Sequence, residues 1–128
     1  MLDNKTIQAN LIGLLTNGDN SGPVWSTESE DLDCTFVSWQ DGQGVVAHVN
    51  SEVDVVMIVL FGFGKATVGD EAIELSRGQV VLVPKGVHRS IHAVGDGLAY
   101  LNVHKRRKRL MPGNPDDRPP ASRTTVAV

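Results

Sequence analysis

The chain has 128 residues, 41% of them hydrophobic, which is enough for one globular domain with a buried core. Its single cysteine and its lack of a membrane-length apolar run exclude an internal disulfide framework and a membrane-spanning helix, and they predict a cytoplasmic protein with no membrane partner. The net charge of −3 combines an acidic body, with 13 acidic and 5 basic side chains in residues 1–104, and a basic end, with 2 acidic and 7 basic side chains in residues 105–128.

The first segment predicts a short amphipathic helix. Asp3 or Thr6 can serve as its N-cap, and Gly18 can end it. The following "DNSGPVW" indicates a turn, so we expect residues 1–22 to form an N-terminal helix and a linker. The apolar residues at helical spacing are Ile7, Leu11, Leu14 and Leu15.

From about residue 23 to residue 104 the pattern changes to short apolar runs between turns. The turns "QDGQG", "VGDE", "SRG", "PKG" and "VGDG" are rich in residues that tolerate positive φ. Many short strands at regular spacing, with helix at one end only, predict an antiparallel all-β sandwich or barrel. The expected strands are Val24–Thr27, Cys34–Trp39, Val45–Val49, Val55–Phe61, Lys65–Val68, Ala72–Leu75, Val80–Val83, His88–Ala93 and Leu98–His104.

The stretch "VVMIVLF", residues 55–61, is apolar on both faces of its expected strand. One face belongs in the domain core, and the other needs cover from the N-terminal helix or from a second subunit. Symmetric pairing is the commonest way to cover such a face and the open edges of a sheet. We therefore expect a homodimer.

The last segment, residues 105–128, begins with "KRRKR" and continues with proline-rich sequence that has too few apolar residues to pack. We expect a disordered basic tail that folds back on the acidic body. Because an acidic body repels nucleic acid, we do not expect a nucleic acid partner. The alternative is an interaction protein that acts through this tail.

The stretch "GFGKATVGDEAIELSRGQVVLVPKGVHRSI" resembles the cupin superfamily. Its most specific part is a glycine, five residues, a proline, one residue and a glycine, a pattern that Gly78, Pro84 and Gly86 satisfy. The resemblance covers residues 23–104. It implies a double-stranded β-helix, the jelly-roll barrel of antiparallel strands, preceded here by a short N-terminal helix.

Metal-binding cupins carry three histidines and a glutamate at fixed places in two motifs. By the resemblance, these places fall on His48, Asn50, Val55 and Arg89 in this chain. Only His48 keeps the ligand type. The resemblance therefore implies a small single-domain cupin whose barrel binds no metal cofactor.

Strand alternation puts Arg89 and Ile91 on one face and His88 and His92 on the other. The face with the isoleucine suits the barrel interior, so we expect Arg89 to point inward and both histidines outward. A one-residue bulge would reverse this arrangement. That alternative is a site for zinc, iron, manganese or nickel made from His48, Glu52, Asp54 and His88.

The predicted ligand site is the barrel interior, where a few polar groups lie among apolar walls. Arg89 offers a fork of donors that matches a carboxylate or phosphate, so we expect a small organic anion as ligand. The alternative is that Arg89 pairs with Glu52 or Asp54 and only fills the barrel. The sequence predicts no catalytic residue and leaves open whether the chain is an enzyme, with a metal-dependent dioxygenase or isomerase as the alternative. The expected ligand-binding residues are His48, Asn50, Met57, Phe61, Arg89 and Ile91.

Overall fold

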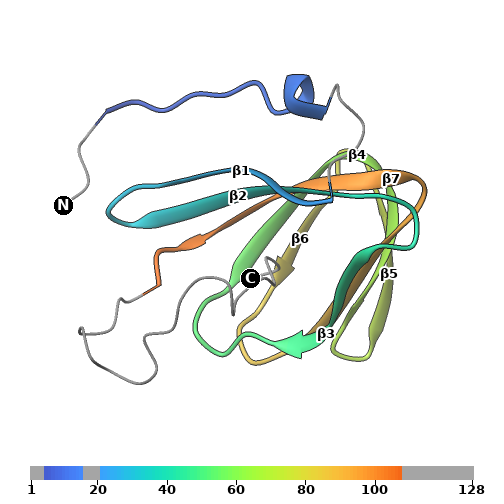
Figure 1. The fold of residues 1–128 in the computed structure, drawn as a ribbon. Coiled ribbons are helices and arrows are strands. Elements are labelled where there is room, and N and C mark those ends of the chain that lie inside the picture. Colours follow the sequence, from blue (N-terminus) through green and yellow to red (C-terminus); the bar gives the residue numbers. More distant parts are fainter. Residues whose placement is uncertain (1–4, 16–20, 108–128) are drawn as a thin grey trace.

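The computed structural model describes residues 5–15 and 21–107, which form an antiparallel β-barrel preceded by one turn of 3-10 helix (Figure 1). The 3-10 turn η1 covers Ile12–Leu15. The strands are β1 (Gly22–Glu28), β2 (Leu32–Trp39), β3 (Gly44–Val49), β4 (Val55–Val68), β5 (Glu71–Ser76), β6 (Val80–Val83) and β7 (His88–Lys105).

The two long strands, β4 and β7, form the frame of the barrel. They pair with each other, and the sheet order is β1-β2-β7-β4-β5, with β3 added to β7 and β6 added to β4. The first half of β4 pairs with the second half of β7, between β2 and β6, and the remaining halves pair between β3 and β5. Because both strands bend, their two halves lie in two facing layers (Figure 1). The antiparallel all-β fold predicted from the sequence is confirmed.

Glycines allow the bends in β4 and β7, and this explains why nine expected strands became seven. Gly62 has φ +80°, and a Cβ atom on it would collide with the carbonyl of Gly97 in the neighbouring strand. An alanine at this position would be both strained and crowded. The predicted breaks near Gly62 and Gly97 are corners in continuous strands.

Among the described residues, the predicted N-terminal amphipathic helix is reduced to a 3-10 turn. In the described part of residues 1–22, only Ile12–Leu15 are helical, and they form a 3-10 turn. The amide of Gly13 donates to the side-chain Oδ1 of Asn10 at 3.1 Å. A glycine inside a helix costs about 1 kcal/mol relative to alanine, and asparagine side chains compete for backbone donors, so a longer helix is disfavoured here.

The basic tail mostly falls in residues 108–128, outside the described residues, so its predicted disorder stays a prediction. Its first residues are described and contact the acidic body. Arg106 pairs with Glu28 at 3.8 Å, and Arg107 pairs with Glu52 at 3.6 Å. Within the described residues, no helix has the length and apolar character needed to cross a membrane.

Candidate functional site

The barrel interior has an apolar end and a polar end. At the apolar end, Leu98, Tyr100 and Val37 are buried, and the Nε1 of Trp39 donates to the hydroxyl of Tyr100 at 2.9 Å. Burial raises the pKa of the Tyr100 phenol well above its usual value. The buried polar residues gather toward the other end, near the loop after β3 and the end of β7. They are Asn50, Arg89, Asn102 and His104.

Arg89 is the central residue of the polar end. It lies on β7 directly opposite His48 of β3 and Val68 of β4. Its exposed fraction is 3%, and the next residues on its face, Ile91 and Ala93, are also buried. The strand alternation therefore has the phase that the sequence predicts, with Arg89 inside the barrel.

The guanidinium of Arg89 has no counter-charge among the described residues. Its Nε and Nη2 are buried and make no hydrogen bond there. Burial lowers the pKa of Arg89, and the positive charge of Arg107 lowers it further. The proposed partner Glu52 pairs with Arg107 instead, and Asp54 accepts a hydrogen bond from the Lys85 amide at 2.9 Å. The alternative in which Arg89 is paired with Glu52 or Asp54 is therefore wrong.

Asn50 adds another buried donor near Arg89. Its Oδ1 accepts hydrogen bonds from the amides of Glu52 at 2.9 Å and Val53 at 3.3 Å, which shapes the loop after β3. Its Nδ2 is buried and makes no hydrogen bond with the described residues. Its carbonyl accepts a hydrogen bond from the Gly86 amide at 2.7 Å, so the loop after β3 lies beside the turn that leads into Arg89 on β7.

His48 is half-buried and faces the same side of the sheet as Arg89. Its Nδ1 donates to the carbonyl of Val46 at 3.0 Å. This bond orients the imidazole ring. A register shift in β3 between Val45 and His48 sets this arrangement.

Two of the three predicted apolar walls face the interior. Met57 is buried opposite Asn102, and Ile91 is buried beside Arg89 on β7. Phe61 is 43% exposed and lies opposite Ala99, because a register shift after Val59 turns it to the outer face. The prediction that Phe61 lines the barrel interior is therefore wrong.

Phe61 instead borders a separate cavity of about 420 Å³ outside the barrel. This cavity lies at the apolar end, between η1 and the edge of β2. Its lining consists of Ile12, Leu15, Ser38, Trp39, Gln40, Asp41, Phe61, Gly95, Asp96 and Leu98.

The alternative metal site does not form from the residues assigned to it. His88 is exposed on the outer face of β7, and Glu52 and Asp54 are exposed in the loop after β3. Among the described residues, no three His, Cys, Asp or Glu side chains lie close enough to hold a metal ion. The donor set His48, Glu52, Asp54 and His88 does not fit a metal ion in this structure.

Sequence reasoning missed three residues at the polar end. Asn102 and His104 are buried on the interior face of β7, and the Nδ1 of His104 donates to the carbonyl of Lys105 at 2.7 Å. Alternation along "LAYLNVH" from Leu98 to His104 was the signal that could have found both. Nothing local to the sequence places Arg107 beside Arg89.

Asp33 faces His104 across β2 and β7. Burial raises the pKa of Asp33, and a hydrogen bond with Glu28 raises it further.

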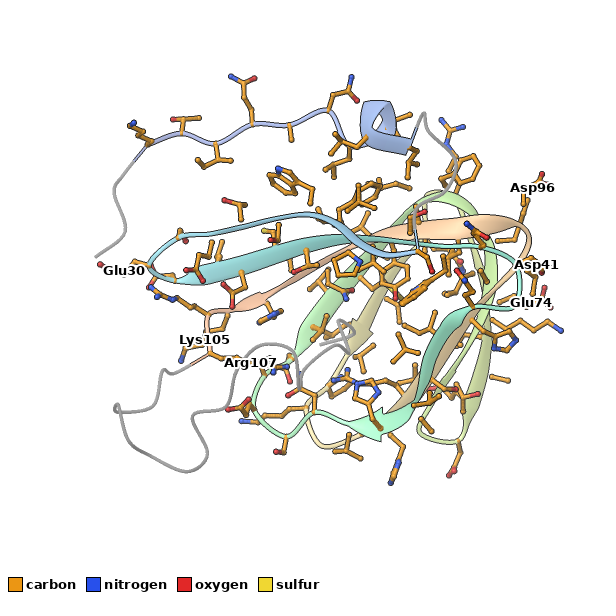
Figure 2. All side chains as sticks on the ribbon, in the orientation of Figure 1. Glu30, Asp41, Glu74, Asp96, Lys105 and Arg107 are labelled. Atoms are coloured by element: carbon orange, nitrogen blue, oxygen red, sulfur yellow. The ribbon has the colours of Figure 1, made fainter. Side chains whose placement is uncertain are left out.

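The fixed charges differ between the two ends of the barrel. Figure 2 shows Lys105 and Arg107 at the polar end, with Glu30 beyond them, and Asp41, Glu74 and Asp96 at the opposite end. Asp41 accepts a hydrogen bond from the Gly95 amide at 2.9 Å and ties two loops together there. Acidic side chains are therefore labelled at both ends, whereas the labelled basic side chains lie at the polar end.

Comparison with known proteins finds similarity at the level of structure. No family model and no characterised protein matches the sequence. Among solved structures, a cupin-2 domain protein from Shewanella frigidimarina is 22% identical, with a TM-score of 0.64 over 77% of this chain and 94% of that one. A cupin superfamily protein from Desulfitobacterium hafniense is 22% identical, with a TM-score of 0.56 over 62% and 71%. KdgF from Halomonas sp. is 18% identical, with a TM-score of 0.60 over 64% and 76%.

These similarities, together with the barrel topology, identify the fold. The chain has a cupin fold, a double-stranded β-helix. It is a small cupin-fold protein, as the glycine-proline-glycine pattern from Gly78 to Gly86 predicts. At these identities the likeness concerns the fold alone, so function must be argued from the interior residues.

Proposed function

We propose that the protein binds a small organic anion in the polar end of its barrel, with Arg89 as the principal binding residue. The observation that carries this proposal is the pair of buried, unpartnered donors on Arg89 within the described residues. A buried charge without a counter-charge is costly, and an arginine in this state is stabilised by any ligand that supplies a carboxylate.

The identity of the two donors favours a carboxylate. Nε and Nη2 lie on the same edge of the guanidinium group, and their two N–H bonds point in parallel. A carboxylate presents two oxygens at matching spacing and can accept both hydrogen bonds at once. The Nδ2 of Asn50 is a further buried donor without a hydrogen bond among the described residues, and it supports an acceptor-rich ligand at this end.

The walls limit what can bind beside the anionic group. Met57 and Ile91 are buried next to the polar residues, and Val55 and Val83 continue the apolar lining from β4 and β6. A ligand with a short apolar body attached to one carboxylate fits this mixture. We propose binding and assign no reaction.

A thermal-shift experiment on dialysed full-length protein tests the proposal with a panel of small carboxylates and inorganic phosphate. A ligand at about 100 times its Kd adds about 2.7 kcal/mol to the stability, so a binding compound should raise the Tm by about 10 °C. Arg89→Met should abolish the ligand-induced rise in Tm, because it removes the guanidinium donors. It keeps most of the apolar part of the side chain.

The control is Arg77→Met, since Arg77 is exposed in the turn after β5, away from the barrel interior. This variant should keep the ligand-induced shift. Equal shifts in the wild type and Arg89→Met, or no shift with any compound of the panel, would contradict the proposal.

A further inference from the structure

Glu52 is held at the mouth of the proposed anion site. Its amide donates to the Oδ1 of Asn50, which is buried and whose carbonyl accepts from the Gly86 amide, three residues before Arg89. Its carboxylate forms an ion pair with Arg107, with 3.6 Å between Oε1 and Nε. The Glu52 side chain is 58% exposed, so its carboxylate lies at the surface of the polar end.

Two positive charges and one negative charge therefore meet at this mouth. Arg89 lies inside the barrel, and Arg107 lies close enough for its charge to act on Arg89. Glu52 offsets the charge of Arg107, while Arg89 has no carboxylate partner among the described residues. The sum over these three side chains is one positive charge.

Other charged residues at this end make further contacts, and the backbone of Arg107 reaches Asp33 among them. Arg106 pairs with Glu28 at 3.8 Å, and Asp33 interacts with Glu28 and with His104. Arg106 also donates its amide to the carbonyl of Asp31 at 2.8 Å, which holds it against the turn between β1 and β2. Arg106 and Glu28 thus form a second arginine–glutamate pair, beside the turn between β1 and β2.

We infer that Glu52 is a specificity-determining residue that restricts the barrel to ligands with a single negative charge, namely small monocarboxylates. This inference rests on the proposed function. A monocarboxylate on Arg89 neutralises the remaining positive charge and leaves the Glu52–Arg107 pair in place. A dianion brings a second negative charge toward Glu52 and is disfavoured by like-charge repulsion or by disruption of that pair.

Succinate and succinamate test the inference, because they have nearly the same shape and differ by one negative charge. We expect calorimetric titration of the full-length protein at low ionic strength, where charge effects are least screened, to show tighter binding of succinamate. Glu52→Gln should tighten succinate binding about fivefold, as expected for partly exposed charges, and should leave succinamate binding within about twofold.

Glu28→Gln is the matched control, since Glu28 is also a glutamate paired with an arginine at this end of the barrel. It should leave the ratio of the two dissociation constants unchanged. If Glu52→Gln leaves that ratio unchanged while Arg89→Met abolishes binding of both ligands, the charge-selectivity inference is overturned and the anion site stands. If neither ligand binds the wild type or Glu52→Gln, the charge-selectivity inference is overturned, and the thermal-shift panel decides whether the anion site stands.

Discussion

The two ends of the barrel interior are formed by the same strands but have opposite effects on stability. At the apolar end, Val37, Val59 and Tyr100 are fully buried, and the one polar group among them is hydrogen bonded to Trp39. At the polar end, Arg89 and Asn50 keep buried donors without partners among the described residues. The apolar end therefore contributes stability, whereas the polar end costs stability in the ligand-free protein and is suited to binding.

This difference follows from the strand halves that form each end. Along β7, the interior positions change from Leu98 and Tyr100 to Asn102 and His104 within a few residues. Alternation requires all of them to face inward, so the sequence places polar groups inside although each one has a desolvation cost. A barrel that only had to be stable would carry apolar residues at these positions.

The substitution with the largest expected effect on the free energy of unfolding lies at the apolar end. Leu75→Ala should lower the free energy of unfolding by about 2–5 kcal/mol, because Leu75 is 1% exposed and its truncation leaves a cavity. Urea unfolding measures the change, and Leu82→Ala on the exposed outer face of β6 should change it by no more than about 0.5 kcal/mol. Similar losses in both variants would show that this end is not a packed core.

Shortening a side chain at the polar end should raise the free energy of unfolding instead of lowering it. Arg89→Met should raise the free energy of unfolding of the ligand-free protein by about 1–3 kcal/mol, because it removes a buried charge that has no counter-charge among the described residues. The measurement is urea unfolding of dialysed protein, with Arg77→Met as the exposed control. A loss of stability in Arg89→Met would indicate that Arg89 has a structural partner, and the contrast between the ends would fail.

The smallest expected effect concerns Asp33 beside the polar end. Its pKa is raised from 3.8 by burial and by the hydrogen bond with Glu28, so the folded state holds this proton more tightly than the unfolded state. The stabilising contribution of the protonated form is present below the unfolded pKa and is lost as the pH rises through the folded pKa.

As the pH rises above about 4, the Tm of the wild type should therefore fall further than the Tm of Asp33→Asn. The difference between the two falls should be about 2 °C. Thermal melts of both proteins across the acidic range provide the measurement. If the difference between the two proteins grew in the opposite direction, with Asp33 stabilising the fold more as the pH rises, the assigned direction of the shift would be wrong.

Much of the fold and one part of the site were predictable from the sequence, because they depend on local periodicity. The two-residue period gives the strands, the turn residues give their ends, and the spacing from Gly78 to Gly86 gives the cupin resemblance. The inward orientation of Arg89 follows from its phase relative to Ile91. Each of these features is set by residues within one strand and its flanking turns.

Only the tertiary structure decided the remaining features, because they depend on contacts between strands far apart in the sequence. The register shift after Val59 turns Phe61 outward, and the glycine corners join four expected strands into two. Arg107 pairs with Glu52, and its charge acts on Arg89. Both interactions depend on the end of β7 lying beside the loop after β3. A period of two residues determines which face a side chain takes, but pairing across the sheet determines its neighbours.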